Sequence, residues 1–245
     1  MIKKVYLLML AIVIGCVLIF AGTTWAIPAL QMYIEGASYD SVSDTWVLDP
    51  VEDDSFKLWT IGNVGAVGTI YNVRLAVAYE DPGEELVSIT LTPGTTGGYA
   101  GFTDTSTPIA PTYIQTVDDG SSPILSNGSS LGPHGIFGEG TEWQEFLLGN
   151  FDSTDSPIGD FGGSVPAIGT NPPMGQINVY EVAVTGTSVV HFDLYDFYES
   201  NNLAKAVFAP YSHDSEANVP EPATAFLLLG LMIFGFLPLM KKRDF

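Results

Sequence analysis

Apolar and polar side chains alternate along six segments in the middle of this 245-residue chain. In the first segment Leu30, Met32 and Ile34 share one face. The six segments are residues 30–34, 56–61, 74–79, 86–91, 176–184 and 188–198. A period of two among Val, Ile, Tyr, Phe and Thr, interrupted by Gly, Pro and Asp, is typical of β-strands. The sequence therefore predicts strands in all six, with a turn at residues 185–187.

The stretch 92–140 is richer in Gly, Ser, Thr and Pro and has a weaker pattern, which predicts long loops with one or two short strands. Residues 142–148 fit a strand or a short helix, and we favour a strand. Several short strands in a chain of this length favour a sandwich or a jelly roll. We therefore expect an all-β protein with one jelly-roll-like β-sandwich domain at residues 27–211. A polar stalk at residues 212–218 should lift this domain from a membrane.

The N-terminus has the order of features found in a signal peptide. Lys3 and Lys4 precede an apolar run at residues 5–20, and Ala26 ends a small-x-small exit, so cleavage after Ala26 is expected. A retained N-terminal membrane anchor is one alternative. Lipidation of Cys16 within a lipoprotein-like box is another, although the apolar run continues past this cysteine.

A second apolar run lies near the C-terminus. Residues 223–240 carry no charge, and Lys241, Lys242 and Arg243 follow directly. Eighteen helical residues rise about 27 Å, which is enough to cross the hydrocarbon of a bilayer. The basic residues should stay in the cytoplasm and leave the body outside. A permanent single-span anchor is the simplest interpretation of this tail taken alone.

The residues before this run change that interpretation. Val219, Pro220, Glu221 and Pro222, followed by the apolar helix and the basic end, resemble the PEP-CTERM sorting signal. The resemblance implies processing by an exosortase after signal peptidase has acted. It also implies only transient attachment to the inner membrane, and then display on the surface of a Gram-negative bacterium that makes exopolysaccharide.

The body carries a second resemblance. Residues 30–40, 45–47 and 190–195 are similar to the bodies called choice-of-anchor N proteins, which are joined to different surface anchors. That family has no assigned activity, so the resemblance implies surface display without naming a ligand.

Charge limits the partners of the body. Between residues 27 and 218 the basic residues are Lys57, Arg74 and Lys205, against 26 of the 28 acidic residues of the chain. Nucleic acid is therefore not expected as a partner, because its binding relies on Lys and Arg. Cys16 is the only cysteine, so the mature chain should form neither disulfides nor thiolate metal sites.

Few side chains suggest a site. The imidazoles are His134, His191 and His213, and alternation places His191 on one strand face with Asp193 and Tyr195. His191 and Asp193 suit a metal or acid–base role. They also suit a hydrogen-bonded pair on the less buried face of a strand.

Calcium is the one cofactor that the sequence suggests. Asp152, Asp155 and Asp160 lie in a turn-rich loop and offer the hard oxygens that Ca²⁺ prefers. The spacing does not match an EF-hand loop, and acidic turns without an ion are common in secreted β proteins.

The expected function is that of a structural or adhesive protein of the cell surface or exopolysaccharide matrix. The sequence lacks Gly-x-Ser-x-Gly, His-Glu-x-x-His and a phosphate-binding Gly loop, so no enzyme is expected. A carbohydrate-binding module or a glycan-processing enzyme is the alternative. Five aromatic residues are candidates for stacking on sugars or for filling the core: Trp46, Trp59, Trp143, Tyr99 and Tyr113.

Overall fold

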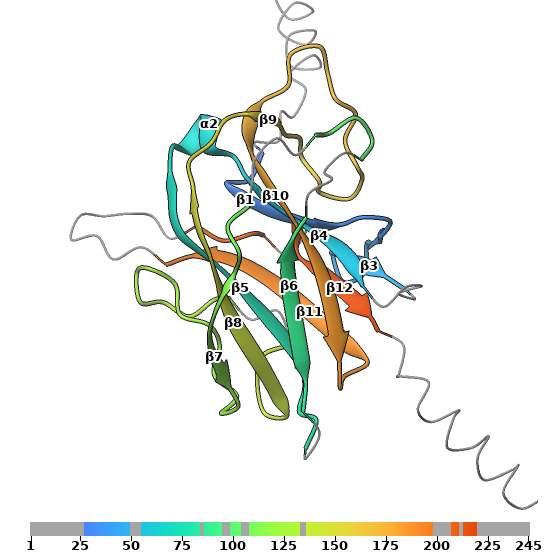
Figure 1. Cartoon of the computed structure of the whole chain (residues 1–245), viewed down its shortest axis with the longest axis vertical. Helices are drawn as coiled ribbons and strands as arrows, with labels where there is room; N and C mark the ends of the chain where they lie inside the picture. Colours follow the sequence, from blue (N-terminus) through green and yellow to red (C-terminus); the bar gives the residue numbers. More distant parts are fainter. Residues whose placement is uncertain are drawn as a thin grey trace, which may run out of the picture.

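The protein is built almost entirely from strands arranged in two sheets (Figure 1). The computed structural model describes residues 27–49, 55–83, 86–94, 99–103, 108–132, 136–197, 207–210 and 213–219. The all-β prediction is confirmed, since the one helix of the described residues is the four-residue α2 (Val64–Val67).

The first sheet has the order β1-β4-β10-β6, and its neighbours are all antiparallel. Its strands are β1 (Leu30–Ile34), β4 (Phe56–Gly62), β10 (Met174–Thr185) and β6 (Ser88–Pro93), and β9 (Ser156–Pro157) adds a short pair to β10. Most residues of the central strands β4 and β10 are buried, and the exposed residues of β10 are Met174, Glu181 and Thr185.

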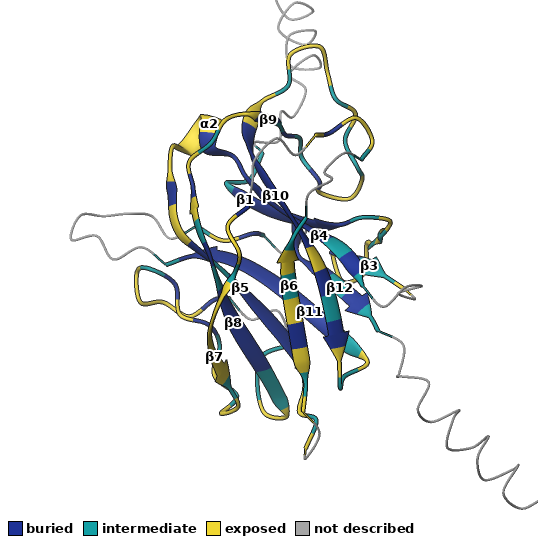
Figure 2. Cartoon of the chain, viewed as in Figure 1, coloured by how far each residue is buried: buried dark blue, intermediate teal, exposed yellow. Residues whose placement is uncertain are grey.

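The second sheet has the order β2-β3-β12-β11-β5-β8-β7. Its strands are β2 (Ser38–Asp40), β3 (Thr45–Leu48), β12 (Ser215–Asn218), β11 (Val189–Asp196), β5 (Ile70–Glu80), β8 (Thr141–Phe151) and β7 (Thr112–Val117). All neighbours are antiparallel except β12 and β3, which are parallel. The edge strand β7 is the most exposed of the longer strands, as Figure 2 shows.

One cluster of buried apolar side chains contains residues from both sheets. Leu30, Met32 and Ile34 of the first sheet belong to it, as the alternation of β1 predicts. The rings of Phe56 in β4 and Phe192 in β11 meet edge to face, with centroids 5.9 Å apart. The two sheets therefore share one hydrophobic core.

The structure confirms that the six predicted segments contain strands, and it adjusts their ends. Strand β6 begins at Ser88 rather than at residue 86, and Leu86 is 91% exposed. Residues 142–148 belong to the strand β8 rather than to a helix. Within the described part of the stretch 92–140, β7 is the one named strand besides the last two residues of β6.

The predicted stalk is wrong. Ser215–Asn218 forms β12, which pairs with β11 on one side and β3 on the other. Ala217 is fully buried and belongs to the shared core, and the backbone N–H of Val219 donates to the carbonyl of Ser188 over 2.7 Å. Polar residues occupy an inner strand here because their backbone groups complete two ladders, so the domain extends to residue 219.

Both terminal signals lie outside the described residues, apart from Val219, the first residue of the sorting motif. The undescribed parts are the predicted signal peptide at 1–26, and the rest of the sorting motif with the apolar run after residue 219. Within the part of the chain that the structure describes, no helix has the length and apolar character needed to cross a membrane.

Candidate functional site

The strand β11 carries two ionisable side chains that the fold buries. His191 and Asp193 lie two residues apart on one face of the strand, while Phe192 and Leu194 point into the shared core. Asp214 joins them from the position just before β12, the neighbouring strand. His191, Asp193 and Asp214 are only 5%, 2% and 2% exposed. The expectation of a less buried strand face for His191 and Asp193 is therefore wrong.

The imidazole of His191 stands between carboxylates. Its Nε2 lies 3.6 Å from Oδ2 of Asp193 and 3.5 Å from Oδ2 of Asp214. Its Nδ1 lies 3.8 Å from Oε2 of Glu216, the residue opposite His191 in the ladder between β11 and β12. Among the described residues, His191, Asp193 and Asp214 are the one group of three whose ligating atoms all lie within 4.8 Å of one another.

Asp214 is held from the β3 side of the sheet. The backbone N–H of Trp46 donates to its carbonyl over 3.3 Å. The side chain of Thr45 lowers the pKa of the Asp214 carboxyl and so opposes the effect of burial. The position of Asp214 is thus fixed by β3, whereas His191 and Asp193 are fixed by β11.

The electrostatics of the cluster follow from its burial. Burial raises the pKa of Asp193 and of Asp214, because it penalises the charged carboxylates. Burial alone would lower the pKa of His191, but the carboxylates of Asp193, Asp214 and Glu216 outweigh it and raise the pKa of the imidazole. The cluster without an ion therefore retains protons near neutral pH that the unfolded chain would release.

A second histidine forms a direct pair with a carboxylate. Nε2 of His213 lies 2.7 Å from Oδ1 of Asp160, the length of a charge-assisted hydrogen bond. The same carboxylate oxygen accepts the N–H of Gly162 over 3.0 Å. This pair links the segment before β12 to the loop after β9, and it does not belong to the one group of three possible metal ligands among the described residues. The third imidazole, His134, lies outside the described residues.

The structure does not bring the predicted calcium ligands together. Asp152 and Asp155 are exposed, and the Oδ1 of Asp155 accepts the hydroxyl of Ser156 over 3.1 Å. Asp160 turns instead to His213. The geometry therefore gives no support to one ion shared by these three carboxylates.

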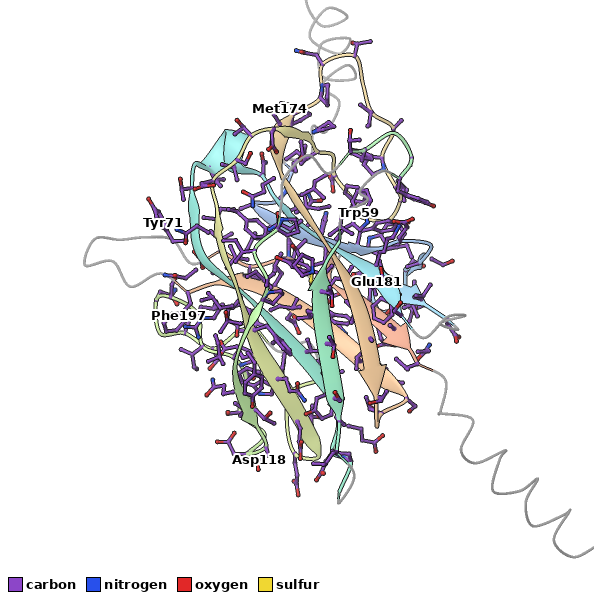
Figure 3. The ribbon with its side chains drawn as sticks, viewed as in Figure 1. Trp59, Tyr71, Asp118, Met174, Glu181 and Phe197 are labelled. Carbon is purple, nitrogen blue, oxygen red and sulfur yellow. The ribbon has the colours of Figure 1, made fainter. Side chains whose placement is uncertain are left out.

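The three candidate tryptophans are core residues. Trp46 and Trp59 pack edge to face against Tyr33, and Trp59, labelled in Figure 3, is fully buried. Trp143 is also buried and donates its indole N–H to the carbonyl of Ser121 over 2.8 Å. Of the two candidate tyrosines, Tyr99 is half-buried and packs against the core, and Tyr113 on β7 is 54% exposed.

A separate polar network centres on the buried Glu145. Its carboxylate accepts hydrogen bonds from Arg74 over 2.7 Å, from Tyr195 over 2.7 Å and from Gln115 over 2.8 Å. The guanidinium of Arg74 also lies 3.8 Å from the ring centroid of Phe197, which Figure 3 labels at the side of the body. This network joins four strands of the second sheet, β5, β7, β8 and β11, and has the character of a structural support.

Sequence reasoning found half of the histidine cluster. The period of two in β11 brings His191 and Asp193 together, and the sequence indicates this directly. Asp214 and Glu216 were missed because their segment is polar and short. The signal that was available is the alternation of Asp214 and Glu216 with Ala217 and Val219, which is weak over so few residues.

Comparison with known proteins gives no relative. A scan of family models, a search of curated proteins and a search of solved structures found no match.

Proposed function

We propose that this protein is exported and displayed as a structural or adhesive component of the cell surface or exopolysaccharide matrix of a Gram-negative bacterium. Signal peptidase would cut after Ala26, and an exosortase would act at the sorting signal that begins at Val219. The observation that carries the proposal is the position of the last described strand. Strand β12 stops at Asn218, directly before that signal, so removal of both ends would leave every described strand in the chain.

We infer that the two sheets form a jelly-roll-like β-sandwich. The shared core and the ring contact between Phe56 and Phe192 support this arrangement. Such a body does not rely on disulfides, in keeping with the absence of cysteine after residue 16.

The charge of the body suits this role. Its excess of carboxylates keeps an exported protein soluble and apart from other anionic surfaces. Divalent cations at the cell surface can bridge such carboxylates to acidic polysaccharide. A structural or adhesive role therefore needs no dedicated catalytic cleft.

The carbohydrate-binding alternative draws no support from the aromatic residues that suggested it. Trp46, Trp59 and Trp143 are buried, so their rings have no free face for a sugar. Tyr113 is exposed, but one ring on an edge strand is a poor platform.

Intact mass of the protein recovered from the cell surface and the medium tests the proposal, with and without the exosortase of the host. We expect a mass that lacks both ends and that depends on the enzyme. A matched variant with Glu221→Ala in the sorting motif should keep its tail, and Glu216→Ala, five residues earlier, should be processed normally. Recovery of a mass that retains residues 223–245 in wild-type cells would make this a membrane-anchored protein.

The role at the surface has its own test. Deletion of the gene should weaken cell aggregation or change the retention of surface polysaccharide. Unchanged aggregation and polysaccharide in the deletion strain would remove the matrix role while leaving export intact.

A further inference from the structure

We propose that His191, Asp193 and Asp214 bind one divalent transition-metal ion of the zinc class, which fastens the segment before β12 to β11. This site is independent of the sorting signal and of the display role. It joins two strands that lie side by side in the second sheet (Figure 1).

The donor set selects the class of ion. One imidazole and two carboxylates are ligands that Zn²⁺ and similar ions accept, and the two carboxylates offset the charge of a divalent cation. Ca²⁺ takes six to eight oxygens, and Mg²⁺ prefers a shell of oxygens and water. An imidazole facing two carboxylates in a buried position fits neither of these.

The spacing of the donors is compatible with a bound ion. Two ligands about 2.1 Å from a tetrahedral ion lie about 3.4 Å apart. The Nε2 of His191 is 3.6 Å and 3.5 Å from its two carboxylate oxygens. The pair of His213 and Asp160, made of the same two residue types, closes to 2.7 Å.

The charges around the cluster are compatible with a bound cation. Lys57 pairs with Glu35, and Arg74 pairs with Glu145, so neither of these two described basic residues serves Asp193 or Asp214. In a setting of low dielectric, the carboxylates of Asp193 and Asp214 would offset the charge of a bound divalent ion.

Metal-binding histidines usually have a carboxylate or carbonyl beside the ring nitrogen that does not bind the metal, and His191 has such a neighbour. The carboxylate of Glu216 lies on the Nδ1 side of His191, where it favours the tautomer that presents Nε2 as a ligand. The backbone N–H of Trp46 holds the carbonyl of Asp214 in place. Three protein ligands leave a fourth position for water or for one further protein group.

Zinc binding by the full-length chain in detergent tests the site. After treatment with a chelator and dialysis against ZnCl₂, we expect one zinc per chain and a rise in Tm, because an ion that binds only the folded state stabilises it. Asp214→Asn and His191→Gln should lose the bound zinc. Glu216→Gln should weaken binding about 10- to 100-fold, as groups behind metal ligands do.

Matched controls come from the second histidine pair. His213→Gln and Asp160→Asn change the same residue types in the same domain and should bind zinc as the wild type does. The proposal is overturned if the wild type takes up no zinc, if it binds only calcium, or if Asp214→Asn and His191→Gln bind zinc like the controls.

X-ray absorption of the zinc-loaded wild type covers the case in which the ligand variants fail to fold. Scattering from one imidazole together with oxygen ligands at about 2.0–2.2 Å supports the site. A shell without imidazole overturns it.

Discussion

The buried carboxylate of Glu145 contributes to stability through three hydrogen-bond donors that surround it. It accepts hydrogen bonds from Arg74, Tyr195 and Gln115, and it is 2% exposed. Replacing it with Leu removes the partner of a largely buried guanidinium. We expect Glu145→Leu to lower the free energy of unfolding by about 3–5 kcal/mol, measured by urea denaturation with tryptophan fluorescence.

A milder change at the same site supplies the control. Tyr195→Phe removes one hydrogen bond to the carboxylate and leaves the ion pair, so about 1.5–3 kcal/mol should be lost. If Glu145→Leu costs no more than Tyr195→Phe, the ion pair with Arg74 contributes nothing beyond its packing.

Strand β12 is short, but its removal should destabilise the domain strongly. It has four residues, but it lies between β3 and β11 and brings Ala217 into the shared core. A chain that ends after Pro210 leaves both neighbours with an open edge. We expect that chain to lack cooperative unfolding by circular dichroism, whereas a chain that ends at Val219 should unfold cooperatively.

The comparison of these two chains tests whether residues 213–219 are a structural part of the domain or only a stalk. Equal melting temperatures would mean that residues 213–219 add nothing to the domain. In that case the original expectation of a stalk would be correct.

The elements differ in how far the sequence reveals them. Alternation identifies β1, β4, β5, β10 and β11, because each buries a regular set of apolar residues on one face. β12 escaped detection, since its stability comes from backbone ladders with β3 and β11 rather than from its own hydrophobicity. The same limit applies to the site. The sequence predicts that His191 and Asp193 share a face of β11, but the approach of Asp214 depends on long-range strand pairing, which the sequence does not indicate.

Over the whole molecule, acidic groups determine how stability depends on pH. Burial raises the pKa of Asp196 and also that of Glu142. A carboxyl whose pKa is raised by folding contributes stability that is present below its unfolded value near 4 and is lost as pH rises through the folded value. The net charge of −20 adds self-repulsion in the same direction.

We therefore expect the protein treated with a chelator to melt at a higher temperature at pH 5 than at pH 8. Added salt should reduce the part of this difference that comes from surface repulsion, because salt screens exposed charges more than buried ones. A higher Tm at pH 8 than at pH 5, with chelator present, would show that the buried carboxylates gain more from ionisation than burial costs them.

The position of β12 also has a mechanical consequence. A pull applied through Val219 acts on a strand that is hydrogen-bonded on both sides, to β3 in parallel and to β11 in antiparallel orientation. Such a load along the strand must break both ladders together, whereas an edge strand can be peeled away one bond at a time. A force applied to the C-terminal end of the body therefore acts on an inner strand, whose two hydrogen-bonded ladders resist shear more than the single ladder of an edge strand.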